Sequence, residues 1–383
     1  MGIYTEYLDK GLSFQQLTDE RKKQLRRISK IRGRDVLVFA ADLNKNIPLI
    51  SIGYPDLLPI ADQLANLKGK ALDLILETPG GSGEVAEDIV RLLRSKYDDI
   101  AVIIPGWAKS AGAIMAMAGD DILMEPASAL GPIDAQMVWQ AKIFSAHALL
   151  EGFEKIKDEV KNTGTLNKAY IPILQAISPG ELQSAQNALD FAKALVTQWL
   201  VRYKFKNWEK HASTGEPVTN QQKEERAAEI ADELCDHGRW LTHARSIKLD
   251  DLEKMRVRIT DYSKNPELTD AIRRYHTLLQ MTFVTNIYKV FETPDSQIYR
   301  FQGVVAQPAA PAQQANAVAF DVPCPNCKKI HKIQANLGAQ HPLQPGCTPF
   351  PADNKLVCEC GAVTDLSEAR RQIEVQSKKT VVT

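Results

Sequence analysis

Short apolar runs alternate with amphipathic stretches between residues 35 and 134, and few folds are compatible with that order. A strand that is apolar along its whole length is typical of a parallel sheet buried on both faces, and apolar residues at helical spacing predict covering helices. The predicted strands are 35–42, 48–54, 72–78, 100–106 and 121–126. The predicted helices are 55–67, 82–97 and 110–119. The alternation therefore predicts an α/β domain built on a parallel sheet.

The remaining segments show other patterns. Residues 139–236 are mainly helical in pattern, 247–262 predict a helix followed by a strand, and 265–291 predict a long helix. Near the N-terminus, residues 21–34 hold eight Lys or Arg and no acid, with apolar residues at helical spacing. A solvated helix or arm is favoured there over a contact with nucleic acid or lipid.

Composition excludes several classes of protein. The 383 residues carry 47 basic and 47 acidic side chains, so no net charge draws the chain to nucleic acid or to an anionic membrane. A hydrophobic content of 44% is that of an ordinary globular protein and excludes disorder throughout. No apolar run reaches the roughly 18 residues of a membrane span, and the first residues lack the pattern of a signal peptide. We therefore expect a cytoplasmic protein without a membrane contact.

The C-terminal part of the chain differs in composition. Residues 303–319 contain seven Ala, three Gln and two Pro, which predicts a flexible linker. Five of the six cysteines follow it, and two close pairs of thiolates can hold Zn²⁺ tetrahedrally. The expected ligands of this structural zinc ion are Cys324, Cys327, Cys358 and Cys360. The side chains that could replace one of them are His331, His341 and Cys347.

Three local features of the α/β region could carry chemistry. The glycine loop, TPGGSG at residues 78–83, follows a predicted strand, and its paired glycines let backbone N–H groups point at an anion. A steric turn or a phosphate cradle would use glycines too, but the Lys-Ser/Thr of a P-loop and a full GxGxxG are missing, which argues against nucleotide binding. Ser110, before a small-residue helix, is either an N-cap or a nucleophile. Asp134 follows a tight turn and is either a turn former or a functional carboxylate.

Three blocks of sequence resemble the serine dehydrogenase proteinase family, a relative of the Clp protease proteolytic subunit and of signal peptide peptidase A. The blocks are LILETPGGSGEVAEDIVRLLR, AKSAGAIMAMAGDDILM and SALGPIDAQ, and the resemblance extends over roughly residues 35–262. It implies the Clp/crotonase fold, an α/β superhelix of repeated ββα units, and a serine hydrolase that assembles into homo-oligomers. The family is described with its catalytic residues in the order Ser, Asp, His.

The resemblance implies a site for each member of a catalytic triad. Ser110 would be the nucleophile, Asp134 the orienting carboxylate, and His243, in a WLTHARSI stretch similar to the family's Trp-Thr-His, the base. The oxyanion hole would use the N–H groups of Gly81 and Ala111, with Gly80 setting the turn. His237 is the main rival base. A Ser–Lys dyad is the other rival, and the lysines that could form it are Lys109, Lys142, Lys155 and Lys161.

These features together predict four regions and one function. The regions are a basic N-terminal arm (1–34), a Clp/crotonase-like serine protease domain (35–302, with a helical insertion at about 139–236), a linker (303–319) and a zinc-ribbon-like module (320–383). The predicted function is serine-type hydrolysis of peptide or protein substrates. The alternatives are a crotonase-type acyl-CoA enzyme, or a non-catalytic assembly or binding protein that recruits a partner through the zinc module.

Overall fold

The computed structural model describes residues 2–139, 142–211, 214–302 and 316–383. These residues group into two compact units. The larger unit consists of Lys22–His276 and Tyr288–Arg300, and the smaller one of Met1–Arg21, Thr277–Ile287 and Phe301–Thr383. Most of the predicted linker at 303–319 lies outside the described residues, and the predicted domain boundaries stay predictions.

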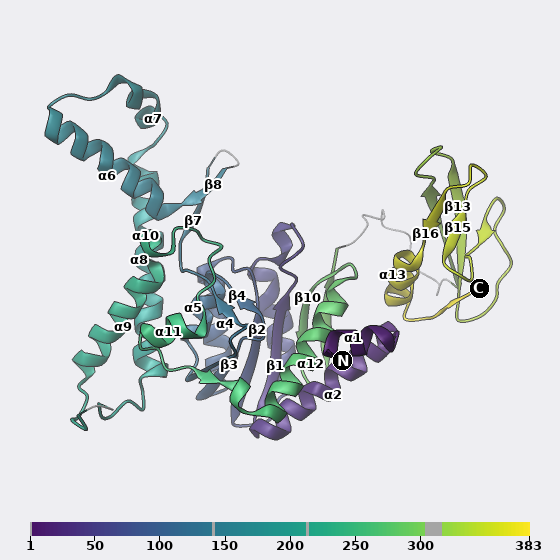
Figure 1. The fold of residues 1–383 in the computed structure, drawn as a ribbon, viewed down its shortest axis with the longest axis horizontal. Helices are drawn as coiled ribbons and strands as arrows, with labels where there is room; N and C mark the ends of the chain where they lie inside the picture. The colour runs from purple at the N-terminus through teal and green to yellow at the C-terminus, as the bar shows by residue number, and fades with distance from the viewer. Residues whose placement is uncertain (1, 140–141, 212–213, 303–315) are drawn as a thin grey trace. The chain divides into compact units, whose positions relative to one another are not determined.

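A seven-stranded sheet lies at the centre of the larger unit, in the order β11-β10-β1-β2-β3-β5-β9 (Figure 1). Its strands are β1 (Asp35–Ala41), β2 (Ala71–Glu77), β3 (Asp99–Ile103), β5 (Asp121–Met124), β9 (Thr260–Asp261), β10 (Ile287–Glu292) and β11 (Gln297–Phe301). Neighbours from β1 to β9 are parallel, with Val38 opposite Ile75 and Leu74 opposite Val102. Strand β10 runs antiparallel to β1. The predicted parallel sheet is therefore confirmed, with an antiparallel addition at one edge.

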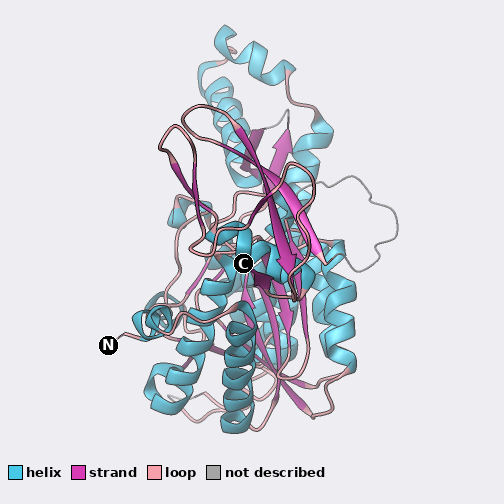
Figure 2. Ribbon diagram, turned by 90° about the vertical axis from the view of Figure 1, so that its right-hand side faces the viewer, coloured by secondary structure: helices cyan, strands magenta, loops and turns pink. Residues whose placement is uncertain are grey.

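Helices cover both faces of this sheet (Figures 1 and 2). On one face, alternate strand residues such as Phe39 and Val102 form a continuous apolar core with α3 (Leu57–Ala65), α4 (Gly83–Arg94) and α5 (Ala111–Met117). On the other face, side chains from α2 (Phe14–Arg32) and α12 (Pro266–Phe283) contact the strand residues that point the opposite way. Burial on both sides explains why these strands are apolar along their whole length.

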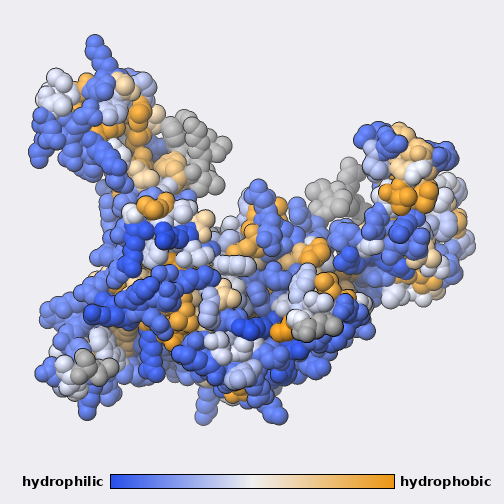
Figure 3. Space-filling view, viewed as in Figure 1, coloured by the Kyte–Doolittle hydropathy of each residue, from blue (hydrophilic) through white to orange (hydrophobic). Residues whose placement is uncertain are grey.

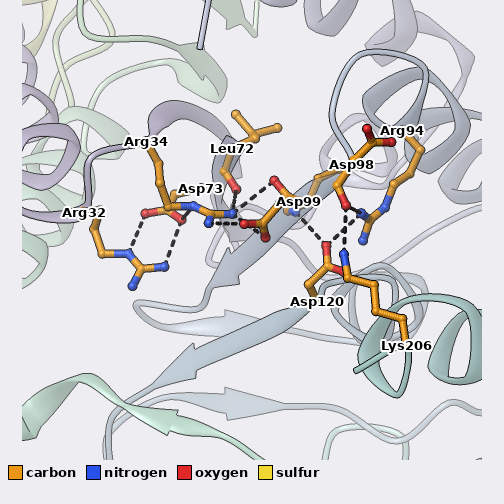
Figure 4. Close-up of polar contacts among 10 residues, drawn as sticks. Arg32, Arg34, Leu72, Asp73, Arg94, Asp98, Asp99, Asp120 and Lys206 are labelled. Carbon is orange, nitrogen blue, oxygen red and sulfur yellow. Dashed lines mark hydrogen bonds and ion pairs between the residues drawn. The ribbon is translucent and has the colours of Figure 1, made fainter. Parts of the chain in front are cut away.

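Charged contacts attach the end of α2 to the sheet (Figure 4). Asp73, fully buried in β2, forms ion pairs with Arg32 at 2.8 Å and Arg34 at 2.7 Å, and Arg34 also pairs with Asp99 at 2.8 Å. Leu25, on the same helix, is fully buried. Of the expected helix or arm, the structure has a helix up to Arg32, but the expected solvated character is wrong because one face of α2 packs. Arg32, at its end, and Arg34, just after it, neutralise acids of the sheet.

The predicted insertion contains the helices α6 (Ala146–Thr163), α7 (Ile171–Gln175), α8 (Pro179–Trp199) and α9 (Asn220–Cys235), with a 3₁₀ turn (Lys168–Tyr170) and a π-helical turn (Leu200–Lys204). Trp199 of α8 and Ile230 of α9 belong to the apolar core that covers the sheet. A hairpin of β7 (Gln136–Trp139) and β8 (Lys142–Ser145) precedes these helices. Short elements complete the unit: β4 (Trp107–Ala108), β6 (Ala129–Leu130), α10 (His237–Trp240), α11 (Leu249–Lys254) and a 3₁₀ turn (Tyr262–Lys264).

Two predicted elements are wrong. Residues 48–54 form no strand but two 3₁₀ turns, Pro48–Ile50 and Tyr54–Asp56, each with a proline at its start. Proline lacks the N–H that a strand ladder needs. The long helix predicted to reach residue 291 ends at Phe283, because the following β-branched and aromatic run pairs with β1 as strand β10.

The smaller unit contains α1 (Ile3–Asp9), where Tyr7 packs with Leu17 and Leu278. Its C-terminal residues form a β-rich module with one apolar core that includes Ile333 and Phe350. The module's elements are β12 (Ala317–Pro323), β13 (Ile330–Leu337), β14 (Thr348–Pro349), β15 (Lys355–Val357), β16 (Val363–Asp365), α13 (Ser367–Ser377) and β17 (Val381–Val382).

The surface shown in Figure 3 is mainly hydrophilic, with scattered apolar side chains. Tyr54 and Leu58 are among the exposed large apolar residues, at 67% and 77% exposure. Among the described helices, none combines the length and the apolar character needed to cross a bilayer.

Candidate active site and metal centre

Ser110 lies in the serine turn (residues 106–111), which connects β3 to α5. Its backbone has φ 50° and ψ −118°, a conformation that residues other than glycine rarely adopt. An N-cap serine would accept a hydrogen bond from an amide of the first helical turn, but the Ser110 side chain forms no capping bond. Strain at a serine whose hydroxyl is not used in capping is typical of turns that present a nucleophile.

The glycine loop packs directly against the serine turn. Thr78 pairs with the turn through two backbone hydrogen bonds of 2.9 and 3.0 Å. Gly80 has φ +99°, and a Cβ there would lie 2.7 Å from Ser110 Cβ. Gly81 has φ +148°, and a Cβ there would lie 2.4 Å from the backbone nitrogen of Ile52. Both positions therefore require glycine, for conformation and for space.

Two backbone amides beside Ser110 are available to a ligand. The Gly80 N–H donates to Thr78 Oγ1 at 3.1 Å and is already used. Within the described parts of the chain, the N–H groups of Gly81 and Ala111 have no acceptor. Donors of this kind, fixed in position before the reaction, can stabilise an oxyanion that develops on a substrate.

Asp134 is 3% exposed and lies between several polar side chains. The hydroxyl of Ser145 donates to Asp134 Oδ1 at 2.6 Å, and the amide of Gln136 donates to Oδ2 at 2.8 Å. Burial alone would raise the pKa of Asp134, but the neighbouring imidazole of His243, the Ser145 hydroxyl and the charge of His237 together lower it. Asp134 is therefore a carboxylate at neutral pH. Sequence patterns gave no sign of Ser145 or Gln136 as its partners.

Two histidines approach the same oxygen of Asp134. The distance from Nδ1 to Asp134 Oδ2 is 3.4 Å for His237 and 3.8 Å for His243. His237 also stacks on His147, with ring centroids 5.7 Å apart. His243 Nδ1 is buried and has no hydrogen-bond partner in the described residues. The fold thus brings both candidate bases to the candidate carboxylate.

The candidate lysines of a Ser–Lys dyad lie in different surroundings. Lys109 Nζ donates to acceptors of residues 244–246, directly after His243. Lys155 forms a surface ion pair of 2.7 Å with Glu151, and Lys161 is exposed. The side chain of Lys142 lies outside the described residues.

One part of the chain matches a family of known proteins. Residues 4–177 match the family described as ClpP-like SDH-type serine proteinase. The similarity to that family is confined to this part of the chain. The matched segment includes the glycine loop, Ser110 and Asp134, whereas His237 and His243 lie beyond it.

The chain is also similar to two uncharacterized proteins of Methanocaldococcus jannaschii. One is 32% identical over 133 residues, which is 33% of this chain and 46% of the relative. The other is 31% identical over 153 residues, which is 37% of this chain and 50% of the relative. The chain thus spans about half the length of the curated relatives it matches.

Among solved structures, a mutant form of the 1510-N membrane-bound stomatin-specific protease is similar at 15% identity. The similarity covers 58% of this chain and 79% of that protein, with a TM-score of 0.32.

Four cysteines of the C-terminal module form a candidate metal centre outside the part matched to the proteinase family. Cys324 and Cys327 lie in the turn between β12 and β13, and Cys358 and Cys360 in the turn between β15 and β16. Their sulfur atoms all lie within 4.8 Å of one another, with Cys324–Cys360 at 3.5 Å and Cys327–Cys358 at 3.6 Å. Four thiolates about 2.3 Å from one ion would have sulfurs about 3.8 Å apart, so the cluster fits a tetrahedral metal.

The predicted alternative ligands take no part in this cluster. Among the described residues, the group that could hold an ion consists of the four cysteines and excludes His331, His341 and Cys347. The backbone amide of Cys327 is the main cause that lowers the pKa of the Cys324 thiol to about 6. The thiolate is the form of cysteine that binds metal ions, so this shift favours a role of Cys324 as a ligand.

Proposed function

We propose that the chain is a serine peptidase. Ser110 is the nucleophile, His243 the general base and Asp134 the carboxylate that orients the imidazole. The N–H groups of Gly81 and Ala111 form the oxyanion hole. The observation that carries the proposal is the serine turn: a strained serine whose hydroxyl is not used in capping, next to two amides without acceptors, in a segment that matches a serine proteinase family.

The chemistry follows from the properties of these groups. A serine hydroxyl is a weak nucleophile, so His243 takes its proton as the oxygen attacks the substrate carbonyl carbon. The carbonyl oxygen becomes an oxyanion and accepts hydrogen bonds from the two amides. Imidazolium then donates its proton to the leaving amine, and water hydrolyses the acyl-serine by the same steps in reverse. Asp134 stabilises the imidazolium without being protonated.

His243 is preferred to His237 as the base for two reasons. The Nδ1 atom of His243 is buried, near Asp134 and without another partner, so Asp134 can fix its tautomer and leave Nε2 for the serine. In addition, Lys109, the residue before Ser110, binds the backbone directly after His243. His237 instead stacks on His147.

Peptide hydrolysis by matched variants tests this proposal. We expect the purified chain to cleave unstructured peptides and Ser110→Ala to lower kcat by about six orders of magnitude, or to the assay background. Ser95→Ala, an exposed serine at the end of α4, serves as the control and should retain full activity. Equal activity in wild type and Ser110→Ala would overturn the proposal and favour a crotonase-type or other use of the fold.

Substrates and assembly are part of the same proposal. An extended peptide beside the glycine loop would place its scissile carbonyl near Gly81 and Ala111, as strand addition does in other peptide-binding sites. We propose that the chain acts as a homo-oligomer, since the family it resembles assembles. The C-terminal module would recruit a partner or a substrate.

We further propose that the four-cysteine cluster holds a structural zinc ion. All four tetrahedral positions would be filled by Cys324, Cys327, Cys358 and Cys360, which leaves none open for a reacting water. Zinc would join two turns of a small module whose apolar core is limited, and its binding would support folding.

A further inference from the structure

The side chain of Lys109 is directed at the histidine loop (residues 241–247). Lys109 Nζ donates to the carbonyl oxygens of Arg245 at 3.1 Å and Ala244 at 3.4 Å, and to the hydroxyl of Ser246 at 3.1 Å. These three acceptors follow His243 directly in the chain. An ammonium group has three donors, and here each has an acceptor.

The backbone of Lys109 belongs to the serine turn. Its N–H donates to the carbonyl of Thr78 in the glycine loop at 2.9 Å, and its carbonyl accepts from Gly112 of α5 at 2.8 Å. Lys109 therefore contacts the glycine loop, the helix that follows Ser110 and the histidine loop.

The structure leaves space for this contact. A Cβ at Gly131 would lie 2.6 Å from Lys109 Cδ and 3.0 Å from its Cα, so any other residue at this position would obstruct the lysine. Gly131 also donates its N–H to the carbonyl of Ala108 at 3.0 Å, which fixes it beside the serine turn.

The histidine loop has few other attachments near His243. At its far end, Ile247 pairs with Leu130 through two backbone bonds of 2.9 and 3.0 Å. At its near end, Leu241 is 71% exposed and has φ 64°. Among the described residues, the hydrogen bonds that attach residues 244–246 to another segment come from Lys109.

We propose, on the basis of the proposed function, that Lys109 is a positioning residue that holds the histidine loop against the serine turn and so keeps His243 in reach of Ser110. It does not take the serine proton. The hold is strongest while the side chain is an ammonium, since a neutral amine donates weaker hydrogen bonds to carbonyls.

The charge of Lys109 depends on pH in the mildly alkaline range. Burial lowers its pKa to about 8, and the nearby ammonium of Lys248 acts in the same direction. The titratable or charged residues of the loop that Lys109 binds are His243 and Arg245. Below pH 8 the ammonium is present, and as pH rises through 8 it is lost, so the hold on the loop should weaken.

Two substitutions separate positioning from proton transfer. Lys109→Met keeps the aliphatic length but removes the donors, and we expect kcat to fall about 10- to 100-fold with little change in KM. Lys109→Arg keeps a charge at all accessible pH values, so it should retain more activity than Lys109→Met and lack the wild-type decline above pH 8. The proposal would be overturned if Lys109→Arg were as inactive as Lys109→Met. It would also be overturned if the activity of wild type and of Lys109→Arg declined equally above pH 8.

Hydrogen exchange tests the contact between Lys109 and the histidine loop without depending on activity. In Lys109→Met at pH 7, the Arg245 amide, which donates to Thr242, should exchange faster, while the Ile247 amide, bound to Leu130, serves as an internal control. If the Arg245 amide exchanged faster in Lys109→Met but the wild-type protein were inactive, the proposed peptidase activity would be refuted. The positioning role of Lys109 would still stand. If exchange of this amide were unchanged in Lys109→Met and the wild-type protein were active, the positioning role would be refuted. The peptidase activity would still stand.

Discussion

Ser110 combines a reactive group with an unfavourable backbone conformation. A positive φ at a residue that carries a Cβ costs about 1–3 kcal/mol, and the surrounding structure must impose it. Gly80 is part of that surrounding structure, because only a residue without a Cβ can approach Ser110 Cβ so closely. The glycine loop therefore both supplies a candidate oxyanion donor and permits the conformation of the serine.

The strain at Ser110 can be measured by comparing two substitutions. Glycine adopts a positive φ readily and alanine does not, so Ser110→Gly should have a free energy of unfolding about 1 kcal/mol higher than Ser110→Ala. Ser95 has φ −67° at the end of a helix, and there glycine should be less stable than alanine. Urea denaturation of the four variants gives both differences. The same order at both positions would contradict a strained serine.

The two histidines near Asp134 give a second prediction. We expect His243→Ala to lower kcat by at least about 10³-fold, because the serine would lose its proton acceptor, and His237→Ala to lower it less than tenfold. Asp134→Asn should cost about 10⁴-fold by fixing the wrong tautomer. Steady-state kinetics on one peptide substrate compares the variants. A larger loss for His237→Ala than for His243→Ala would transfer the role of base to His237.

Part of this site could be predicted from the sequence. The glycine loop, Ser110 and Asp134 follow strands in a regular pattern, so their types and spacing suffice to single them out. The choice between an N-cap and a nucleophile at Ser110 depends on a backbone dihedral that residue types do not reveal. The competition between His237 and His243 arises because α10 and the left-handed Leu241 return the chain to Asp134, a long-range effect.

Helix α2 shows how a charged segment can be part of a packed structure. Its arginines would be solvated in isolation, but β2 presents Asp73 inside the sheet layer, where an unpaired carboxylate would be costly. Arg32 and Arg34 satisfy both of its oxygens. The contact therefore joins the C-terminal end of α2 to β2, the central strand of the sheet.

Removal of the buried charge should destabilise the protein more than removal of an exposed one. Asp73→Asn leaves two arginines without a full counter-charge, and we expect a loss of about 3–5 kcal/mol in the free energy of unfolding. Asp295 forms an ion pair with Arg26 of α2, but its side chain is 86% exposed. Asp295→Asn should therefore lower the free energy of unfolding by only about 0–1 kcal/mol. Chemical denaturation measures both. Equal effects would show that Asp73 is not a buried anchor.

The two wrongly predicted elements, the strand at 48–54 and the helix extended to residue 291, have a common physical cause. The segment 48–54 has the alternation of a strand, but Pro48 and Pro55 favour turns, and Lys289 of β10 binds Ser51 and Asp56 there. Residues 287–291 continue a helical spacing, yet they pair with β1. In both places a partner distant in sequence decides the structure, and local pattern carries no information about that partner.

The whole chain contains a segment that matches a serine proteinase family and a C-terminal module outside that match. The core of the larger unit is extensive, whereas that of the module is small and is accompanied by a cysteine cluster that could hold a metal ion. The clustering of cysteines in sequence predicted that two close pairs on turns would meet, a common metal-binding arrangement. The structure brings the four cysteines together, whereas the sequence left open whether His331, His341 or Cys347 would replace one of them.

Metal removal should therefore affect the two parts differently. The purified protein should contain about one zinc ion per chain, and Cys327→Ser or strong chelation should remove it. Amides of β12 and β13 should then lose protection from hydrogen exchange while those of β1 to β3 keep it. Cys347→Ser, outside the cluster, is the matched control and should keep the metal. Retention of zinc in Cys327→Ser would argue against the four-cysteine site.

The proposed peptidase activity depends most on the reactivity of the Ser110 hydroxyl. Reaction with a fluorophosphonate, followed by peptide mapping by mass spectrometry, tests it directly. We expect one adduct per chain on Ser110, lost in Ser110→Ala, formed more slowly in His243→Ala and still formed in Ser95→Ala. Absence of an adduct from the wild-type protein in every assembly state, or an adduct on another residue that persists in Ser110→Ala, would contradict it.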